Sequence, residues 1–216
     1  MKNVRLFYKK GDRMRFISHL DMTRFMARII RRADLPVWYT EGFNPHLYMT
    51  FALPLSLGMS SEYDVVDIRL LDDGYDISTL CGSLNAVCPP YIKFFDAKDP
   101  VKKAGDVCFA EFKIIFDDMG EAKAELESFL SSNNITVLKK TKKGIIKEIE
   151  VSDKIINFSF DTSDTNTVLN ITLPAGSVEN LNPELILTAF FEQNGSYYCY
   201  DITRTAIFDK DKKLFK

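Results

Sequence analysis

Hydrophobic and polar residues alternate along the first part of the chain in the rhythm of a small α+β domain. Short alternating runs predict strands, and apolar residues three and four positions apart predict helices. The expected order is β-α-β-β-α-β, with strands at 4–8, 37–40, 63–71 and 91–95 and helices at 18–33 and 77–87. This order is typical of the ferredoxin-like fold, an antiparallel sheet with two helices on one face.

The helix at 18–33 has the clearest pattern of the chain. Its apolar positions follow i, i+3, i+4, i+7, i+8 and i+11, which predicts one buried face. Ser18 and Asp21 fit a capping box, in which side chains satisfy backbone donors of the first helical turn. The positions that form the apolar face are Met22, Phe25, Met26, Ile29, Ile30 and Ala33.

A polar link at 96–106, DAKDPVKKAGD, separates this pattern from a second one. Beyond it, strands are expected at 109–116, 135–140, 144–151, 154–161, 167–173 and 197–208, and helices at 120–130 and 183–192. We therefore predict tandem ferredoxin-like domains, one at 1–97 and one with an extra hairpin at 106–216. The final DKDKKLFK is expected either to fray or to form an added arm.

Composition removes several classes of protein. No apolar run reaches the roughly 20 residues of a membrane span, and the N-terminus lacks the apolar segment of a secretory signal, so a cytoplasmic protein without a membrane partner is expected. The four cysteines form no C-x-x-C pair, so no metal site and no cofactor are expected. Cys81 and Cys88 are expected as core positions of one helix.

Charge is distributed unevenly. Residues 1–50 carry ten Lys/Arg against four Asp/Glu, whereas the rest carries 18 against 26. Arg24, Arg28 and Arg31 are spaced to lie along one helix face, where guanidinium groups can bind phosphates, and Arg13 and Arg15 precede that helix. This arrangement favours an anionic partner such as RNA. The alternative is a solvated face neutralised by Asp21 or by the acidic second domain.

Two further groups of residues add candidate chemistry. Ser18 and His19 begin the helix, where free N–H groups can bind a phosphate; the alternative is a simple cap with His19 in solvent. In the loop at 42–46, Phe43, Asn44 and His46 can supply a stacking ring, an amide and a titratable ring for a nucleotide; the alternative is a turn with a buried Phe43.

Arg204 lies in an otherwise apolar late strand. Such an arginine needs a carboxylate partner or faces a functional groove. The sequence leaves these two readings open.

Several segments resemble a bacterial family of unknown function, the radical-SAM-linked proteins. They are RFISHLD (15–21), the R-x-x-x-R-x-x-R-R helix (24–32), EGFNPH (41–46), FALPLSLGMSSEYD (51–64) and DITRTAIF (201–208). Leu47 and Tyr48 stand where members commonly have Lys or Arg after the GFNPH motif. The resemblance implies a radical-SAM protein as partner and implies no reaction.

The leading hypothesis is a non-catalytic accessory protein that binds RNA or presents it to a radical-SAM enzyme acting on tRNA or rRNA. A second hypothesis is a metal-independent RNA endonuclease in which His19 and His46 act as acid and base. A third is a protein-interaction scaffold. Whether the chain forms a homodimer is left open.

Overall fold

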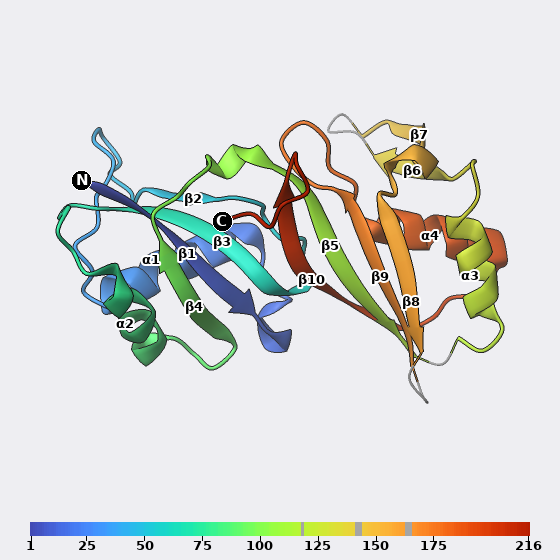
Figure 1. Ribbon diagram of the computed structural model, residues 1–216, viewed down its shortest axis with the longest axis horizontal. Helices are drawn as coiled ribbons and strands as arrows, with labels where there is room; N and C mark the ends of the chain where they lie inside the picture. The colour runs from blue at the N-terminus through green and yellow to red at the C-terminus, as the bar shows by residue number, and fades with distance from the viewer. Residues whose placement is uncertain (118, 141–143, 163–165) are drawn as a thin grey trace. The chain divides into compact units, whose positions relative to one another are not determined.

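The chain folds into two compact units of mixed α+β structure, built on antiparallel strand pairs (Figure 1). The computed structural model describes residues 1–117, 119–140, 144–162 and 166–216. Unit 1 consists of Met1–Val107 together with Arg204–Lys216, and unit 2 consists of Cys108–Thr203. None of the helices in these ranges combines the length and the apolar character needed to cross a bilayer.

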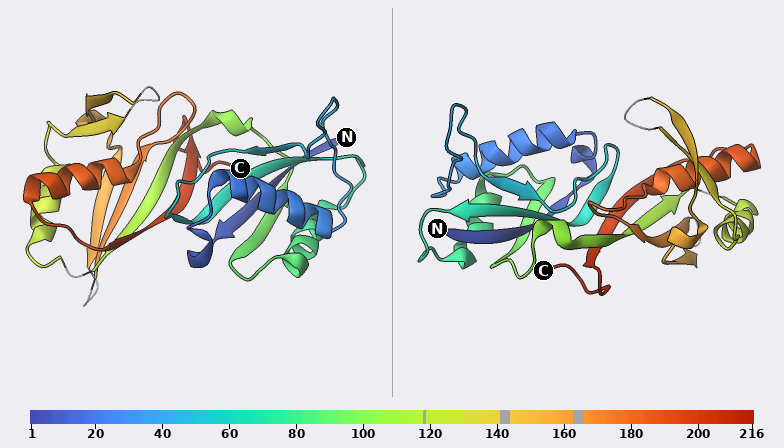
Figure 2. Two further views of the ribbon diagram at one scale, coloured as in Figure 1. Left: turned by 180° about the vertical axis from the view of Figure 1, so that it is seen from behind. Right: turned by 90° about the horizontal axis from the view of Figure 1, so that it is seen from above.

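Unit 1 contains a sheet with the order β4-β1-β3-β2. Alternate residues of β1, β3 and β4 share one hydrophobic core with α1 and α2, so both helices pack on the same face of the sheet, and Figure 2 shows α1 lying across the strands. The elements are β1 (Lys2–Lys10), α1 (His19–Arg32), β2 (Met49–Phe51), β3 (Ser60–Leu70), α2 (Leu80–Val87) and β4 (Ile92–Lys98), with 3-10 turns η1 (Asp12–Met14), η2 (Ile77–Thr79) and η3 (Ala104–Asp106).

The elements of unit 1 follow the sequence pattern with two differences. The expected strand at 37–40 is reduced to two isolated bridges, Val37 with Leu70 and Tyr39 with Leu47, and the paired strand is β2 further along. Pro36 lacks a backbone N–H, so it cannot donate a strand hydrogen bond, and the paired segment at this point is shorter. Met14 and Phe16 alternate like a strand, yet Met14 ends the η1 turn and Phe16 is exposed.

The first strand is buried on both faces, whereas its alternation suggested one buried face. Val4 and Leu6 point into the helix-covered core, and Arg5 and Phe7 on the opposite face are equally inaccessible. Segments distant in sequence, Lys102 and Phe215 among them, cover this second face over Arg5. The alternation of residues within one strand cannot predict that distant segments of the chain bury its second face.

In unit 2 the strands β5, β9 and β8 pair in the order β5-β9-β8, with β10 on the other side of β5, and β6 and β7 form a separate hairpin. Asn182 caps α4, Pro183 occupies its first turn as expected, and Gly195 ends it in the left-handed region with φ 71°. The elements are β5 (Val107–Phe116), α3 (Ala122–Leu130), β6 (Thr136–Lys140), β7 (Ile146–Glu150), η4 (Ser152–Lys154), β8 (Asn157–Thr162), β9 (Thr167–Pro174), α4 (Pro183–Asn194) and β10 (Tyr200–Asp209), the last of which passes into unit 1.

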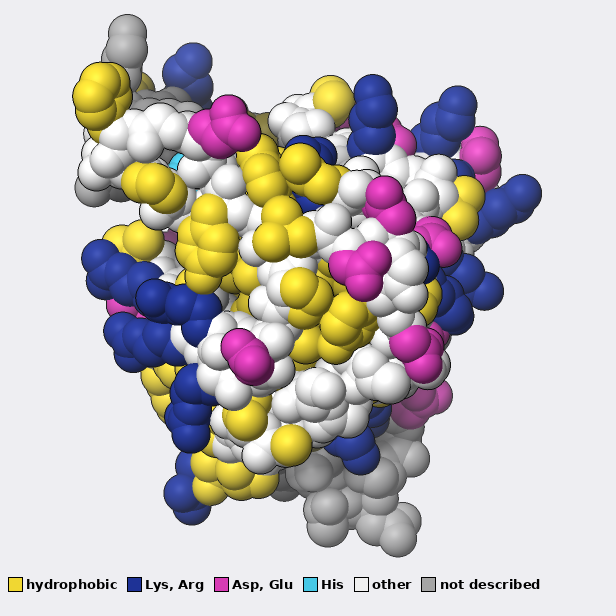
Figure 3. All heavy atoms as spheres, turned by 90° about the vertical axis from the view of Figure 1, so that its left-hand side faces the viewer, with side chains coloured by type: hydrophobic (Ala, Val, Ile, Leu, Met, Phe, Trp, Pro, Cys, Tyr) yellow, Lys and Arg dark blue, Asp and Glu magenta, His cyan; other side chains and the backbone are white. Residues whose placement is uncertain are grey.

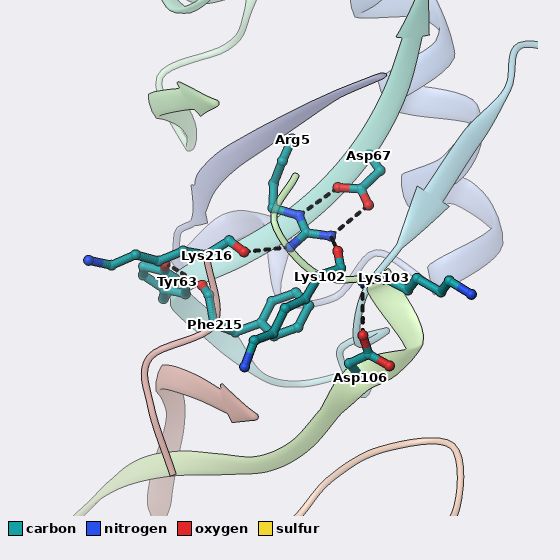
Figure 4. Close-up of polar contacts among 8 residues, drawn as sticks. All are labelled: Arg5, Tyr63, Asp67, Lys102, Lys103, Asp106, Phe215 and Lys216. Carbon is teal, nitrogen blue, oxygen red and sulfur yellow. Dashed lines mark hydrogen bonds and ion pairs between the residues drawn. The ribbon is translucent and has the colours of Figure 1, made fainter. Parts of the chain in front are cut away.

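The last residues of the chain are not frayed but form the added arm that was the alternative expectation (Figure 4). Phe215 is fully buried, and its carbonyl oxygen accepts a hydrogen bond of 2.8 Å from the Tyr63 hydroxyl. The arm belongs with unit 1, although the sequence placed it in the second domain at 106–216. Six of its eight residues are charged, which suggested solvent exposure and concealed the buried ring.

Replacing Phe215 with alanine should lower the free energy of unfolding by about 3 kcal/mol or more, because a buried ring is lost and a cavity remains beside Arg5. Urea unfolding of the full chain measures this loss. Phe43→Ala is the matched control, since Phe43 is fully exposed, and its effect should stay within about 0.5 kcal/mol. Equal effects of the two substitutions would contradict a docked arm.

Candidate functional site

The start of α1 is closed by its own side chains. Ser18 Oγ accepts a hydrogen bond from the Asp21 backbone N–H at 3.2 Å and donates to the Asp21 carboxylate at 2.8 Å. The Ser18 half of the predicted capping box is confirmed, whereas the Asp21 carboxylate accepts from the Ser18 hydroxyl instead of from a backbone N–H. It also places a negative charge in the first turn, so the helix start is a poorer phosphate site than its N–H groups alone suggest.

The arginine row of α1 faces away from the core. At about 100° per residue, Arg24, Arg28 and Arg31 lie opposite the buried positions Met26 and Ile30. Figure 3 shows Lys and Arg side chains along both edges of this view of the molecule. The row is therefore exposed as predicted.

The three arginines of the row are only lightly engaged. Arg24 Nη1 lies 3.2 Å from the Asp21 carboxylate, and both groups are more than half exposed. Arg31 Nε donates to the Ala27 carbonyl oxygen at 3.2 Å. Within the described ranges Arg28 has no recorded polar partner. Exposed pairs of this kind hold side chains weakly, so the guanidinium groups remain available to an anion.

His19 lies on a different side of α1 from this row. Its ring meets the ring of Phe51 edge-on at 5.0 Å between centroids. Burial of part of the ring, and next the nearby charge of Lys10, lower the pKa of His19. The imidazole is therefore neutral at pH 7 and adds no positive charge to a phosphate site.

The loop at 42–46 presents its aromatic ring to solvent. Phe43 is fully exposed, which excludes the expected alternative of a buried ring. His46 Nδ1 lies 2.9 Å from the Thr40 hydroxyl, and the His46 backbone N–H donates to the same oxygen at 3.1 Å. These bonds close the loop and leave Phe43 at its surface, while Asn44 contributes its backbone oxygen to the His46 ring at 3.3 Å.

The two histidines lie at opposite ends of the sheet. His19 shares a small hollow with Lys10, at the end of β1. His46 lies beyond the Tyr39–Leu47 bridge, next to the Val37–Leu70 bridge, and Leu70 pairs with Lys2 at the start of β1. The His19 ring contacts Phe51, whereas the His46 ring contacts Thr40, and no recorded contact joins the two imidazoles within the described ranges. This arrangement gives no support to a paired acid and base for RNA cleavage.

Arg13 and Arg15 also lie near the start of α1 rather than with the row. The guanidinium carbon of Arg13 lies 5.1 Å from the centre of the Tyr91 ring, and that of Arg15 lies 5.0 Å from the centre of the exposed Phe16 ring. The Gly58 N–H donates to the Arg15 carbonyl oxygen at 2.8 Å. The candidate residues thus divide into a cluster at the start of α1 and a row with the 42–46 loop.

Arg204 has a carboxylate partner, which is one of the two readings that the sequence left open, and it is not the nucleic-acid contact that was the other candidate role. Its Nη2 contacts the Asp64 carboxylate and donates to the Leu53 carbonyl oxygen at 2.7 Å. Both Arg204 and Asp64 are almost completely buried. Arg204 is therefore not available to a nucleic acid in this conformation.

The Arg204–Asp64 pair belongs to a buried polar centre that includes Tyr8 and Lys10. Tyr8 pairs with Asp64 across β1 and β3, and burial, followed by the Asp64 charge, holds the pKa of Tyr8 well above its ordinary value. Burial also lowers the pKa of Lys10. The charge of Asp64 opposes this shift, and the charge of Arg204 adds to it. Lys10 Nζ lies 3.5 Å from the Ile17 carbonyl oxygen, and the buried Arg204 Nε has no hydrogen-bond partner among the residues that the structure describes.

Sequence reasoning missed this centre, although a signal was present. Tyr8 and Lys10 share the parity of Val4 and Leu6, and Asp64 shares the parity of the core residues of β3, so polar groups occupy core positions of both strands. The adjoining hollow has room for about one water molecule, at 10 Å³. In this conformation the centre joins strands rather than receiving a substrate.

Replacing Asp64 with alanine should destabilise the protein by about 3–5 kcal/mol, because two buried cations lose their shared carboxylate. Asp21→Ala is the matched control at the exposed pair with Arg24 and should cost less than about 1 kcal/mol. Denaturant unfolding compares the two. A small effect of Asp64→Ala would mean that the centre is not what joins β1 and β3.

The lowered pKa of His19 predicts a pH-dependent stability. The unfolded chain binds a proton on His19 more readily than the folded chain, so folding should be progressively disfavoured as pH falls below about 6.5 through the lower folded pKa. His19→Gln should flatten this part of the stability curve. Parallel curves for the two proteins from pH 7.5 to 5 would contradict the assignment.

Comparisons with solved structures give distant likenesses. The chain is similar to a chain from "Crystal Structure of a Cbf5-Nop10-Gar1 Complex", with a TM-score of 0.49 and 10% identity over 95% of this chain and 50% of that chain. It therefore spans about half the length of that protein. A second likeness, to "an Unknown Protein from Galdieria sulphuraria", has a TM-score of 0.28 and 9% identity over 94% and 98% of the two chains.

No curated protein matches the chain. A family model does match it, over residues 3–183, which include the arginine row, the 42–46 loop and both histidines. This match covers well over half of the chain. The protein therefore belongs to the family described as uncharacterized proteins conserved in bacteria, DUF2344.

Proposed function

We propose that this protein is a non-catalytic RNA-binding subunit that presents tRNA or rRNA to a radical-SAM enzyme. The observation that carries the proposal is the exposed, lightly paired arginine row of α1. Planar guanidinium groups with free donors bind phosphate oxygens in pairs of hydrogen bonds. Spacings of three and four residues repeat along the helix at intervals that a phosphate backbone can follow.

The 42–46 loop extends this surface. The row runs from Arg24 toward Arg31 near the end of α1, and the chain then passes through the Val37–Leu70 bridge to the loop that carries Phe43. A fully exposed aromatic ring that follows a row of cations along the chain suits an unpaired base that stacks while its neighbouring phosphates contact arginine. Single-stranded RNA segments provide both groups.

We also infer that unit 1 is a ferredoxin-like domain and that unit 2 is a diverged second copy. The order β4-β1-β3-β2 with α1 and α2 on one face supports the assignment of unit 1. In unit 2 the β6-β7 hairpin stands apart from the β5-β9-β8 sheet, as an insertion would. Such a scaffold holds α1 rigidly against a sheet, which fixes the spacing of the row.

The radical-SAM partner would dock at the start of α1. Three apolar side chains there are more than half exposed, Phe16, Leu20 and Leu57. The Gly58–Arg15 backbone bond brings the loop that carries Leu57 next to Phe16. Exposed apolar groups beside Arg13 and Arg15 resemble the anchors of a protein interface, where apolar residues and arginine are enriched.

RNA binding should depend on salt and on the row. For three to six phosphate contacts, the slope of log affinity against log salt concentration should be roughly −2 to −5. The double variant Arg28→Glu/Arg31→Glu should weaken binding to bulk tRNA and reduce the magnitude of this slope by about 2. Fluorescence anisotropy of labelled tRNA at several salt concentrations measures both quantities.

A double variant with the same change of charge at exposed lysines away from the row, Lys93→Glu/Lys210→Glu, is the control and should retain most of the slope. A flat salt response of the unmodified protein would refute RNA binding. Equal losses in the two double variants would show that net charge, rather than the row, is what the tRNA senses.

A further inference from the structure

The face of the unit 1 sheet that is turned away from α1 and α2 carries a groove of about 560 Å³. Residues Asn3, Thr50 and Asp67 line it, and they alternate with the core residues Val4, Met49 and Ile68 of the same strands. The loop at 100–105 forms its other wall. The volume is in the range of small-molecule sites, and the groove lies on the opposite side of the sheet from α1.

An aromatic wall closes one side of the groove. The Tyr48 ring lines it, with the Arg69 guanidinium carbon 4.5 Å from the ring centre. The same guanidinium lies 4.9 Å from the centre of the Trp38 ring, and its Nε donates to Asn3 Oδ1 at 3.0 Å. These contacts hold Tyr48 in place before any ligand arrives, so ordering the ring adds little cost to binding.

The base of the groove is neutralised by fixed ion pairs. Both oxygens of Asp67 accept hydrogen bonds of 2.8 Å from Arg5, as Figure 4 shows. The Lys102 ammonium is paired with Asp209. Neither Asp67 nor Lys102 therefore gives the groove a net charge.

The free groups that remain are of three kinds. Lys103 is exposed, and Figure 4 shows its side chain extending away from the Arg5 cluster; in the part of the chain that the structure describes, its ammonium group has no partner. The Thr50 hydroxyl likewise has no recorded partner there, and Asn3 keeps its amide N–H donors. The groove thus offers one aromatic face, a small set of neutral donors and acceptors, and one cation.

From this combination we infer that the groove binds one nucleotide, with the base against Tyr48, its polar edge toward Thr50 and Asn3, and the phosphate toward Lys103. Every base has a face that stacks on an aromatic ring, and the neutral polar groups satisfy a base edge without a net charge. A single lysine at the rim matches the charge of a single phosphate. The nucleotide is either a free monophosphate or one residue of an RNA strand.

Trp38, the only tryptophan in the chain, lies against Arg69 and Tyr48 and so reports occupancy of the groove. Titrating the full chain with AMP, GMP, CMP and UMP should change its fluorescence, with a dissociation constant below about 1 mM for at least one of them or for a trinucleotide. Binding of the trinucleotide alone would assign the groove to RNA rather than to free nucleotides. No response to any of these up to about 10 mM would overturn the inference.

Variants of Tyr48 and Lys103 test the base contact and the phosphate contact separately. Their nucleotide affinities are measured by calorimetry, because a change at Tyr48 alters the fluorescence of Trp38 even without a ligand. Tyr48→Ala should weaken binding at least about fivefold, whereas Tyr48→Phe, which keeps the ring, should not. Lys103→Glu should weaken a monophosphate by about tenfold and leave the corresponding nucleoside unchanged. Lys93→Glu is the matched control, with an exposed lysine on another strand of the same sheet.

Two results would contradict the assigned roles. Ribose 5-phosphate binding as tightly as the nucleotide would exclude the base contact, and unchanged binding in both Tyr48→Ala and Lys103→Glu would place the ligand elsewhere. The α1 double variant Arg28→Glu/Arg31→Glu should bind mononucleotides normally. Its behaviour separates failure of this site from failure of the arginine row.

Discussion

The N–H donors of a buried guanidinium group need hydrogen-bond acceptors. Unit 1 contains two buried guanidinium groups, those of Arg5 and Arg204, whose donors are satisfied to different degrees. Arg5 is fully buried, and its donors reach both oxygens of Asp67 and the carbonyl oxygens of Lys102 and Lys216, each at 2.8 Å. Phe215 packs over the same group at 4.5 Å. Because an unpaired buried charge is strongly destabilising, these segments have to lie where they do once Arg5 is inside.

The donors of Arg204 are satisfied less completely than those of Arg5, because within the described residues its Nε has no partner. Asp64 is the counter-ion of Arg204, and its charge also favours the charged form of Lys10, so one carboxylate faces two buried cationic groups. Burial is the main cause of the lowered pKa of Lys10; the charge of Asp64 opposes this shift, and the charge of Arg204 adds to it. The two arginines stabilise different parts of the sheet. Arg5 holds Asp67 on the face that bears the groove, and Arg204 holds Asp64 beside the hollow that His19 lines.

Local patterns predicted the elements well where the pattern itself decides the structure. The helix at 18–33 formed as α1 with Ser18 as its cap, since apolar spacing and capping are local properties. Pro183 at the first turn of α4 and Gly195 after it belong to the same kind of signal. Core residues of α1 were identified correctly for the same reason.

Features that depend on distant partners were not predictable in this way. The sequence indicated that Arg204 either has a carboxylate partner or faces a groove, and parity places Asp64 on the core face of β3, but no local pattern pairs two residues 140 positions apart. Phe215 looked exposed among lysines, and the distance between His19 and His46 could not be inferred from their positions in the chain. Only the strand order places Lys10 and Lys2 at opposite ends, and with them the two imidazoles.

The bonds of Arg5 also bear on the order in which the chain folds. Its Nη1 donor reaches the carbonyl oxygen of a residue 211 positions later, so the last acceptor becomes available only when residue 216 has emerged during synthesis. Contacts at such separation in sequence slow folding because a long loop must close first. Until that moment the first strand carries an incompletely satisfied guanidinium, and unit 2 has time to fold before unit 1 closes.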